Sequence, residues 1–225
     1  TYLMPLLQYF ANANFDATVS KEDYAYFTLP FTFFSYPFSW ILPMVLIALV
    51  LFVLLVFIGV GKRILSFKEI GKGFIPFLGA TITSGLLGFY GWKFLLHFYP
   101  QYNDLLNGFT YNGHSYIAGF VSLTIAICFV FYQLFSDVKK TMNHYVAPLF
   151  IWLLLNCGLA IGLKGAGFLI IPVFSALLIL AIAVFTNLNK HILKIVFAIT
   201  SIPTIYIFAP LVKMFPVGLG LKNLF

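Results

Sequence analysis

The sequence predicts an all-α fold, a polytopic transmembrane helical bundle of about six spans preceded by a short external amphipathic or interfacial segment. Of its residues, 62% are hydrophobic and only 8% are charged, and the mean hydropathy is +1.01. A soluble domain carries about a quarter charged residues, so this chain has too few polar groups to cover a surface in water. The partner that the composition demands is a lipid bilayer.

One stretch makes this prediction specific. Phe38 to Val60 runs for 23 residues without a charge and is followed directly by Gly61, Lys62 and Arg63. At about 1.5 Å per residue, this is enough helix to cross a hydrocarbon core of roughly 30 Å. A soluble helix of this length would need a polar face, and this one has none.

Residues 1–37 form the external juxtamembrane segment. Leu3, Leu6, Leu7 and Phe10 have the spacing of an amphipathic helix. It is too short to span and could lie in the headgroup region or be the last helix of a preceding soluble domain. A polar linker follows. The aromatic stretch 24–37 contains two prolines, which exclude one regular helix, so we expect an interfacial collar of rings.

The membrane domain covers residues 38–215, and residues 216–225 form an external tail that could lead into further spans. Because the chain begins without Met and stops after a proline-broken apolar segment, we expect a fragment of a longer protein. The six spans are expected at about 38–60, 74–96, 116–135, 145–163, 167–188 and 195–215.

The cations predict the topology. The net charge is +7, and eight of the cations lie in three loops, within 61–73, 136–140 and 189–194. Scattered at the ends of apolar runs, they are typical of cytoplasmic loops and exclude a nucleic-acid partner. Thr1 is then expected on the outer side of the membrane. The long loop 97–115 has no Lys or Arg and should be an external hairpin or folded cap.

Small residues mark candidate helix-packing faces. Ala80, Ser84 and Gly88 recur every four residues in the second span, and Gly158 and Gly162 have the same spacing in the fourth. Such spacing lets two helices approach closely.

Polar and proline positions inside the spans mark further candidates. Asn156 is the most polar side chain deep in any span and is expected to form interhelical hydrogen bonds; the alternative is a place on a substrate path. Pro203 and Pro210 should kink or partly unwind the sixth span, as a packed bend or as a broken-helix binding site.

Other polar residues give weaker signals. His97, Asp104 and His114 share the outer loop without a recognised metal spacing, and we interpret them as loop polarity. His144 and His191 border cytoplasmic loops and should anchor helix ends. Cys128 and Cys157 fall at different depths and are expected to be free thiols. The sequence contains none of four common catalytic or cofactor-binding motifs: a nucleophile elbow, a His-Glu-x-x-His pair, a phosphate loop and a dinucleotide fingerprint.

The segment before the first span resembles the junction in membrane-bound zinc aminopeptidase-like proteins of metallopeptidase family twenty-eight, which include the endoplasmic-reticulum metallopeptidase and the fungal vacuolar membrane protease. The residues that carry the resemblance are Tyr2-Leu3-Met4-Pro5-Leu6, Asn12-Ala13-Asn14, Ser20-Lys21-Glu22-Asp23-Tyr24-Ala25-Tyr26-Phe27, Leu29-Pro30 and Tyr36-Pro37-Phe38-Ser39-Trp40. The high Phe, Ile and Lys content with few Arg suits a Bacteroidetes-like bacterial relative.

This resemblance implies a function. The chain would be the membrane-anchoring domain of a zinc-dependent metallopeptidase, a peptide hydrolase whose soluble domain precedes Thr1 and holds the zinc. No catalytic or metal-ligating residue, and no cofactor, is then expected in this chain. Two alternatives remain: a small-solute transporter or channel subunit built on Asn156 and the sixth span, or a structural subunit that packs against other membrane subunits through its small-residue faces.

Overall fold

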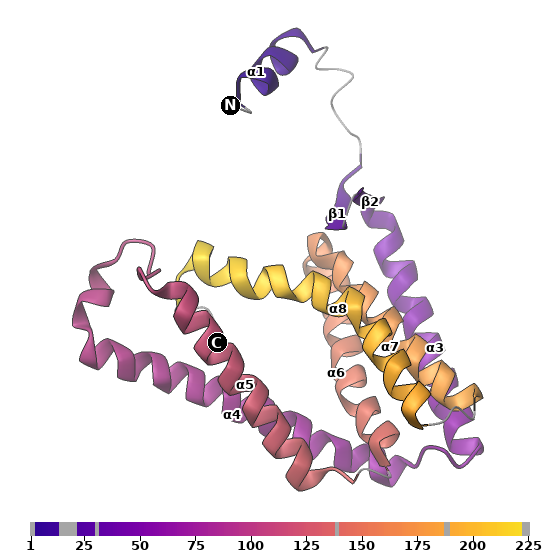
Figure 1. The fold of residues 1–225 in the computed structure, drawn as a ribbon. Coiled ribbons are helices and arrows are strands. Elements are labelled where there is room, and N and C mark those ends of the chain that lie inside the picture. Colours follow the sequence, from indigo (N-terminus) through magenta and orange to yellow (C-terminus); the bar gives the residue numbers. More distant parts are fainter. Residues whose placement is uncertain (1–2, 14–21, 30–31, 138–139, 187–189, 222–225) are drawn as a thin grey trace.

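The computed structural model describes residues 3–13, 22–29, 32–137, 140–186 and 190–221. Their order along the chain is shown in Figure 1. The helices are α1 (Leu3–Asn12), α3 (Ile41–Gly61), α4 (Phe67–Phe98), α5 (Gly113–Phe135), α6 (Thr141–Gly162), α7 (Ile170–Phe185) and α8 (Lys190–Leu219). Two strands, β1 (Tyr24–Leu29) and β2 (Thr32–Pro37), and three 3-10 segments, η1 (Phe38–Trp40), η2 (Pro100–Asp104) and η4 (Lys164–Leu169), complete the described elements.

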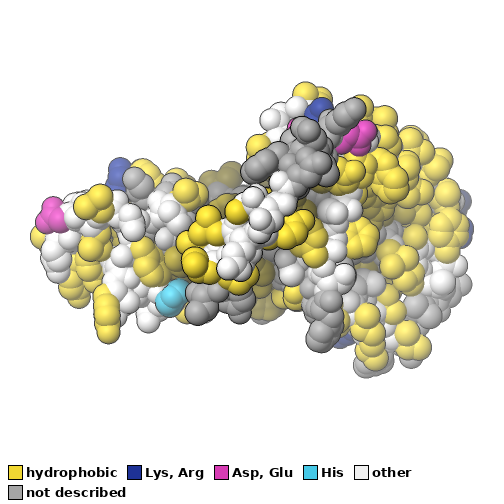
Figure 2. All heavy atoms as spheres, turned by 90° about the horizontal axis from the view of Figure 1, so that it is seen from above, with side chains coloured by type: hydrophobic (Ala, Val, Ile, Leu, Met, Phe, Trp, Pro, Cys, Tyr) yellow, Lys and Arg dark blue, Asp and Glu magenta, His cyan; other side chains and the backbone are white. Residues whose placement is uncertain are grey.

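The predicted fold class is confirmed. Six helical stretches are long and apolar enough to cross a membrane. Large hydrophobic side chains such as Leu46, Phe57 and Phe129 are more than half exposed on the outside of the bundle. Seen from above, hydrophobic side chains cover much of the visible surface and charged ones are few (Figure 2). The chain is an integral membrane protein whose exterior suits a lipid bilayer.

Helix boundaries differ from the predicted spans where charged residues extend a helix. α4 begins at Phe67 rather than near Phe74 because Lys72 and Glu69 pair at 3.0 Å along its first turns, giving the helix a polar extension. The fifth span is divided: Lys164, expected in a short turn, starts the 3-10 segment η4, and α7 follows. The sequence prediction missed the early start of α4 and the division of the fifth span, because it ended each span at the first charged residue.

The core lies among α3, α6 and α7. Its most deeply buried members are small or branched, including Ala48, Val173 and Leu180 at 0% exposure and Val146 at 1%. These side chains form one continuous cluster across the three helices. Close packing at this density lets the three helix axes approach and fixes their mutual positions.

Helices α4 and α5 form a hairpin beside this core. The ring of Phe131 packs against Gly79, and the ring of Phe120 packs against Gly91. Two aromatic rings of α5 therefore occupy the space that side chains on these two residues of α4 would fill. A second, smaller cluster of buried side chains lies at the loop end of this hairpin and includes Trp92. Figure 1 shows the hairpin inclined away from α3 and α7.

Helix α8 bends and connects the two parts. It packs along α7 and also contacts α5. Figure 1 shows that its final turns run across toward the loop between α4 and α5. There Leu221, 1% exposed, joins the second cluster, and its amide donates to the carbonyl of Gly108 at 2.9 Å.

The expected aromatic collar is a β-hairpin. β1 and β2 pair antiparallel with Ala25 opposite Tyr36, and cross-strand rings meet with centroid separations of 5.7 Å (Tyr26 and Phe33) and 5.6 Å (Phe27 and Phe34). Aromatic cross-strand pairs stabilise a short ribbon, which explains why this stretch is extended. In the outer loop, by contrast, the described residues contain no strand; η2 and turns form a cap instead.

The first helix stands apart from these contacts. α1 forms where the amphipathic spacing predicted it, and its apolar side chains Leu3, Leu6, Leu7 and Phe10 are all exposed. This face is available to a surface outside the described residues, such as a headgroup region or a preceding domain.

Candidate functional site: a docked hairpin and two intramembrane cavities

The hairpin of β1 and β2 is seated on the helical bundle. Ala25 is 1% exposed and its cross-strand partner Tyr36 is 6% exposed, and both belong to the main core cluster. At the base of the hairpin, the amide of Phe38 donates to the carbonyl of Asp23 at 2.9 Å. The strands are therefore tied to the point where the chain enters α3.

The seat beneath the hairpin is η4. Phe27 of β1 lies beside Phe168 of η4, with ring centroids 6.5 Å apart. A Cβ at Gly167 would lie 2.7 Å from Cδ1 of Ile41, so the absence of a side chain there lets η4 lie against the start of α3. Lys164 lines a small pocket together with Glu22 and Asp23.

One buried polar atom of the hairpin itself is energetically unfavourable. Among the described residues, the hydroxyl of Tyr36 is buried and has no hydrogen-bond partner. Burial raises the pKa of Tyr36 to about 12, because the phenolate would lose its hydration. The ring is thus retained for its packing rather than for its hydroxyl.

The opposite end of the bundle, which we call the Lys-rich end, holds the ends of α3, α5 and α7 and the starts of α4, α6 and α8 (Figure 1). Oδ1 of Asn143 accepts from the amide of Ser66 at 2.7 Å, and Nδ1 of His144 lies 2.7 Å from the hydroxyl of Ser136. The predicted role of His144 in anchoring helix ends is confirmed. The side chain of His191 lies outside the described residues.

Charged groups add to this end. Oε1 of Glu69 contacts Nζ of Lys72 at 3.0 Å and Nζ of Lys140 at 3.1 Å. Nζ of Lys62 donates to the carbonyl of Val184 at 3.1 Å, which links the end of α3 to the end of α7. Cations of different predicted cytoplasmic loops thus meet at one end of the molecule.

The small residues of the second span are packed within the chain. Ala80 is 2% exposed, Gly88 is buried and the hydroxyl oxygen of Ser84 has no accessible surface. They lie on α4, which contacts both α5 and α6. Among the glycines of α4, Gly73 lies closest to the backbone of another helix, although no sequence pattern marked it: a Cβ there would lie 2.7 Å from Cα of His144.

The candidates of the fourth span are placed differently. Beyond the local helix backbone, no atom of the described residues lies within 4 Å of a Cβ built at Gly158 or Gly162, so their packing role stays a prediction. Asn156 is 3% exposed and donates to the carbonyl of Trp152 on its own helix at 2.9 Å. It lines neither of the two large cavities described below.

The prolines of the sixth span lie inside one helix. α8 continues through Pro203 and Pro210 and bends along its course (Figure 1). Pro203 removes one amide donor, and the hydroxyls of Thr200 and Ser201 donate to the carbonyls of Val196 and Phe197. Such side-chain bonds to the helix backbone also favour bending.

The remaining candidates form no site. Among the described residues, no group of three His, Cys, Asp or Glu side chains could hold a metal ion, and His97, Asp104 and His114 are not brought together as ligands. Cys128 and Cys157 are free, as predicted.

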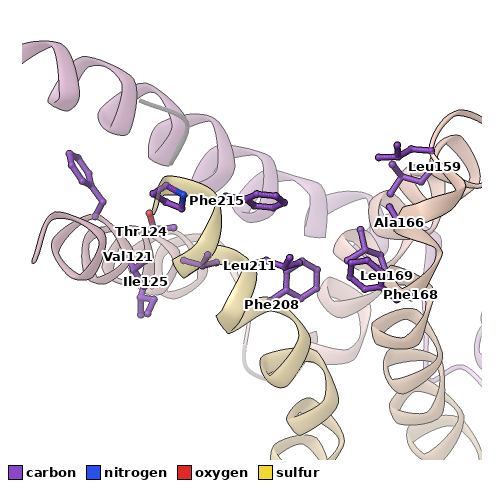
Figure 3. A pocket seen from close by; sticks show the side chains of 14 residues that line it. Val121, Thr124, Ile125, Leu159, Ala166, Phe168, Leu169, Phe208, Leu211 and Phe215 are labelled. Carbon is purple, nitrogen blue, oxygen red and sulfur yellow. The ribbon is translucent and has the colours of Figure 1, made fainter. Parts of the chain in front are cut away.

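Two cavities flank Phe208 of α8. The first, of about 540 Å³, lies among α5, η4, the end of α6 and α8, and Figure 3 shows its lining side chains, which include Val121, Phe168 and Phe215. The lining is apolar apart from the hydroxyl of Thr124. Phe168 is also the residue that contacts the docked hairpin, so this cavity lies directly beneath the seat.

The second cavity, of about 570 Å³, lies among α4, α6, α7 and α8. Hydroxyl-bearing residues lie on three of its walls: Tyr145, Ser175, Thr200, Ser201 and Thr204. Sequence reasoning marked the prolines of α8 but missed these residues. The signal was present, because Thr200, Ser201 and Thr204 lie within about one turn of an otherwise apolar span.

Comparison with known proteins adds no relative to this description: no family model, no curated protein and no solved structure matches the chain. The functional argument therefore stands on the residues and their geometry.

Proposed function

We propose that this chain is the membrane domain of a zinc-dependent aminopeptidase-like metallopeptidase, which anchors and orients a catalytic module joined ahead of Thr1 on the periplasmic side of a bacterial inner membrane. The resemblance of residues 2–40 to family twenty-eight junctions supplies the identity of that module. The zinc and its ligands would belong to the module.

The observation that carries the anchoring role is the docked hairpin. A flexible linker would tether a module without orienting it. Here Ala25 and Tyr36 are buried in the bundle core, and Phe38 is bonded back to Asp23. Whatever precedes Glu22 therefore leaves the membrane domain from a fixed point.

The seat also gives a reason for anchoring at this place. The first cavity is lined by Phe168, which contacts Phe27 of the hairpin, and by residues of α5 and α8. A peptidase held above it would work close to the bilayer, where two zinc ions in the module would activate water for attack on a membrane-associated peptide.

The test uses the natural polypeptide purified from membranes. Its intact mass and peptide map should contain a domain of His, Asp and Glu metal ligands ahead of Thr1, and the protein should release amino acids from aminoacyl substrates in a chelator-sensitive way. A chain that begins at Thr1 should be inactive in the same assay. Peptidase activity from that shorter chain, or a mature protein that starts at Thr1, would refute the proposal.

A further inference from the structure

The second cavity has the features of a ligand site. It is bounded by α4, α6, α7 and α8 and has a volume of about 570 Å³, which is within the usual range for pockets that bind small molecules. Its walls are mainly apolar and aromatic. The edge of the Trp152 ring meets Phe208 at a centroid separation of 5.2 Å, and these rings close the side toward the first cavity.

Two of the hydroxyls that line the cavity, those of Ser175 and Thr204, have no hydrogen-bond partner among the described residues, unlike two others. Thr200 and Ser201 donate to carbonyls of their own helix. In the described chain, no hydrogen bond joins the side chain of Ser175 or Thr204 to another protein atom. A hydroxyl in a hydrocarbon environment gains most from a partner, because water is not available to replace it.

The lining carries no formal charge. Of the residues that the structure describes, no Asp, Glu, Lys, Arg or His lines the cavity. A charged ligand among these apolar side chains would lose its hydration without gaining a counter-charge. An uncharged polar group, by contrast, can exchange hydrogen bonds with Ser175 and Thr204 while its apolar part packs against the rings.

We propose that this cavity binds an uncharged membrane amphiphile, an alkyl chain that carries a hydroxyl or carbonyl oxygen, with its oxygen at Ser175 of α7 and Thr204 of α8. The proposal is independent of the peptidase module. It assigns the hydroxyls that α8 contributes to this cavity to one site.

The first cavity provides an internal comparison. It is similar in volume, about 540 Å³, and shares Phe208, but Thr124 is its one hydroxyl-bearing residue. Alkyl chains should enter both cavities. Preference for an oxygen-bearing chain should arise only in the second.

The experiment follows quenching of Trp152 fluorescence in the full chain in nanodiscs. The probes are bromododecanol, bromododecane and bromododecyltrimethylammonium, which share an alkyl chain and differ in the end group. The quenching that disappears in Trp152→Phe reports the second cavity. It should saturate with bromododecanol at roughly three- to tenfold lower concentration than with bromododecane, the range set by one or two net hydrogen bonds. The ammonium probe should not saturate.

Variants test the assignment of the oxygen. Thr204→Val and Ser175→Ala should each remove part of the preference for the alcohol and leave bromododecane binding unchanged. The matched control is Thr124→Val, which removes a hydroxyl from the first cavity and should change neither. Ser175→Phe should fill the second cavity and abolish saturation by both probes.

The proposal is overturned if the alcohol and the alkane saturate alike, if the ammonium probe saturates equally well, or if Thr124→Val has the same effect as Thr204→Val. To identify the source of the oxygen, dodecyl acetate is used as a competitor. Competition as strong as that of dodecanol assigns an oxygen that only accepts, as in a lipid ester; weaker competition assigns a free alcohol.

Discussion

Helices α3, α6 and α7 differ from α5 and α8 in how much of each is covered by the rest of the chain. In their most apolar windows, 33%, 33% and 39% of the residues of the first three are buried, against 6% for α5 and 6% for α8. All five are apolar enough to span a membrane. Hydropathy therefore identifies the spans, but it does not identify which of them form the core.

Residue size and shape explain the difference. The core helices place Ala48, Val146 and Val173 at their contacts, which lets the backbones approach. In lipid, helices associate through packing rather than through removal of apolar surface from water. Helix α5 packs mainly on α4 through aromatic rings over glycines, and most of its surface faces outward.

The largest expected effect tests this packing on one helix. Leu180 is 0% exposed and Leu178 is 52% exposed, both on α7. Leu180→Ala should lower the free energy of unfolding by about 1 to 3 kcal/mol, because it loses packing while the transfer term is small in lipid. Leu178→Ala should change it by less than about 0.5 kcal/mol. Denaturation with increasing dodecyl sulfate measures both, and equal losses would contradict the comparison.

Glycines provide the second test. Gly73→Ala would place a Cβ 2.7 Å from the backbone of His144, so the α4 and α6 backbones must separate, and we expect a loss of about 1 to 2 kcal/mol. Gly158→Ala meets no atom within 4 Å and should be neutral or stabilising by up to about 1 kcal/mol. A destabilised Gly158→Ala in the isolated chain would show a contact that the structure lacks.

A third test concerns the Lys-rich end. Asn143→Ala removes the acceptor of the Ser66 amide at the start of α4, and the orphaned donor should cost about 1 kcal/mol. Amide hydrogen exchange should rise at the first turn of α4. The control is Asn103→Ala, whose bond to the carbonyl of Pro100 is exposed and should be nearly neutral. Unchanged exchange in Asn143→Ala would remove this anchor from the account.

The smallest effect is expected in the hairpin. Tyr36→Phe removes a buried hydroxyl without a partner and should be neutral or slightly stabilising at neutral pH. In the folded hairpin the pKa of Tyr36 is raised from 10.0 to about 12. The stability of the hairpin is therefore fully present below pH 10 and is lost as the pH rises toward 12, because the phenolate forms more readily in the unfolded chain. At most about 3 kcal/mol of local stability is involved.

Hydrogen exchange of β1 and β2 over that pH range measures this loss. Exchange corrected for its intrinsic pH dependence should rise in the wild type and stay flat in Tyr36→Phe. Tyr24→Phe, at a 45% exposed position of the same hairpin, should behave like the wild type. The same alkaline rise in Tyr36→Phe would show that another group controls the hairpin.

The sequence could predict what depends on composition along the chain. Apolar length located all six spans, and isolated cations located the end at which Lys140 pairs with Glu69 and Lys62 bonds to the end of α7. Proline excluded a helix over residues 24–37 but did not select a strand, because strand pairing depends on the partner that each residue faces. The seat at Gly167 and Phe168 joins segments more than a hundred residues apart, so no local pattern marks it.

The cavities were beyond prediction for a related reason. Thr200, Ser201 and Thr204 can bond to their own helix in any transmembrane segment, so their presence does not predict a site. They indicate a site only together with Ser175 of α7, which lines the same cavity opposite α8. Asn156 shows the opposite case: this polar residue deep in a span attracted attention in the sequence, but its side chain donates to the carbonyl of Trp152 on its own helix.

The measurement that tests the account most directly is the distance between spin labels on the hairpin and its seat, in the full chain in lipid bilayers. Labels at Tyr24→Cys of β1 and Gly165→Cys of η4, with Cys128 and Cys157 replaced by Ser, occupy exposed positions. A hairpin fixed on the bundle predicts one narrow distance distribution, which Ala25→Arg broadens by forcing a large charged side chain into a buried position. A broad distribution before that substitution would contradict the oriented membrane domain.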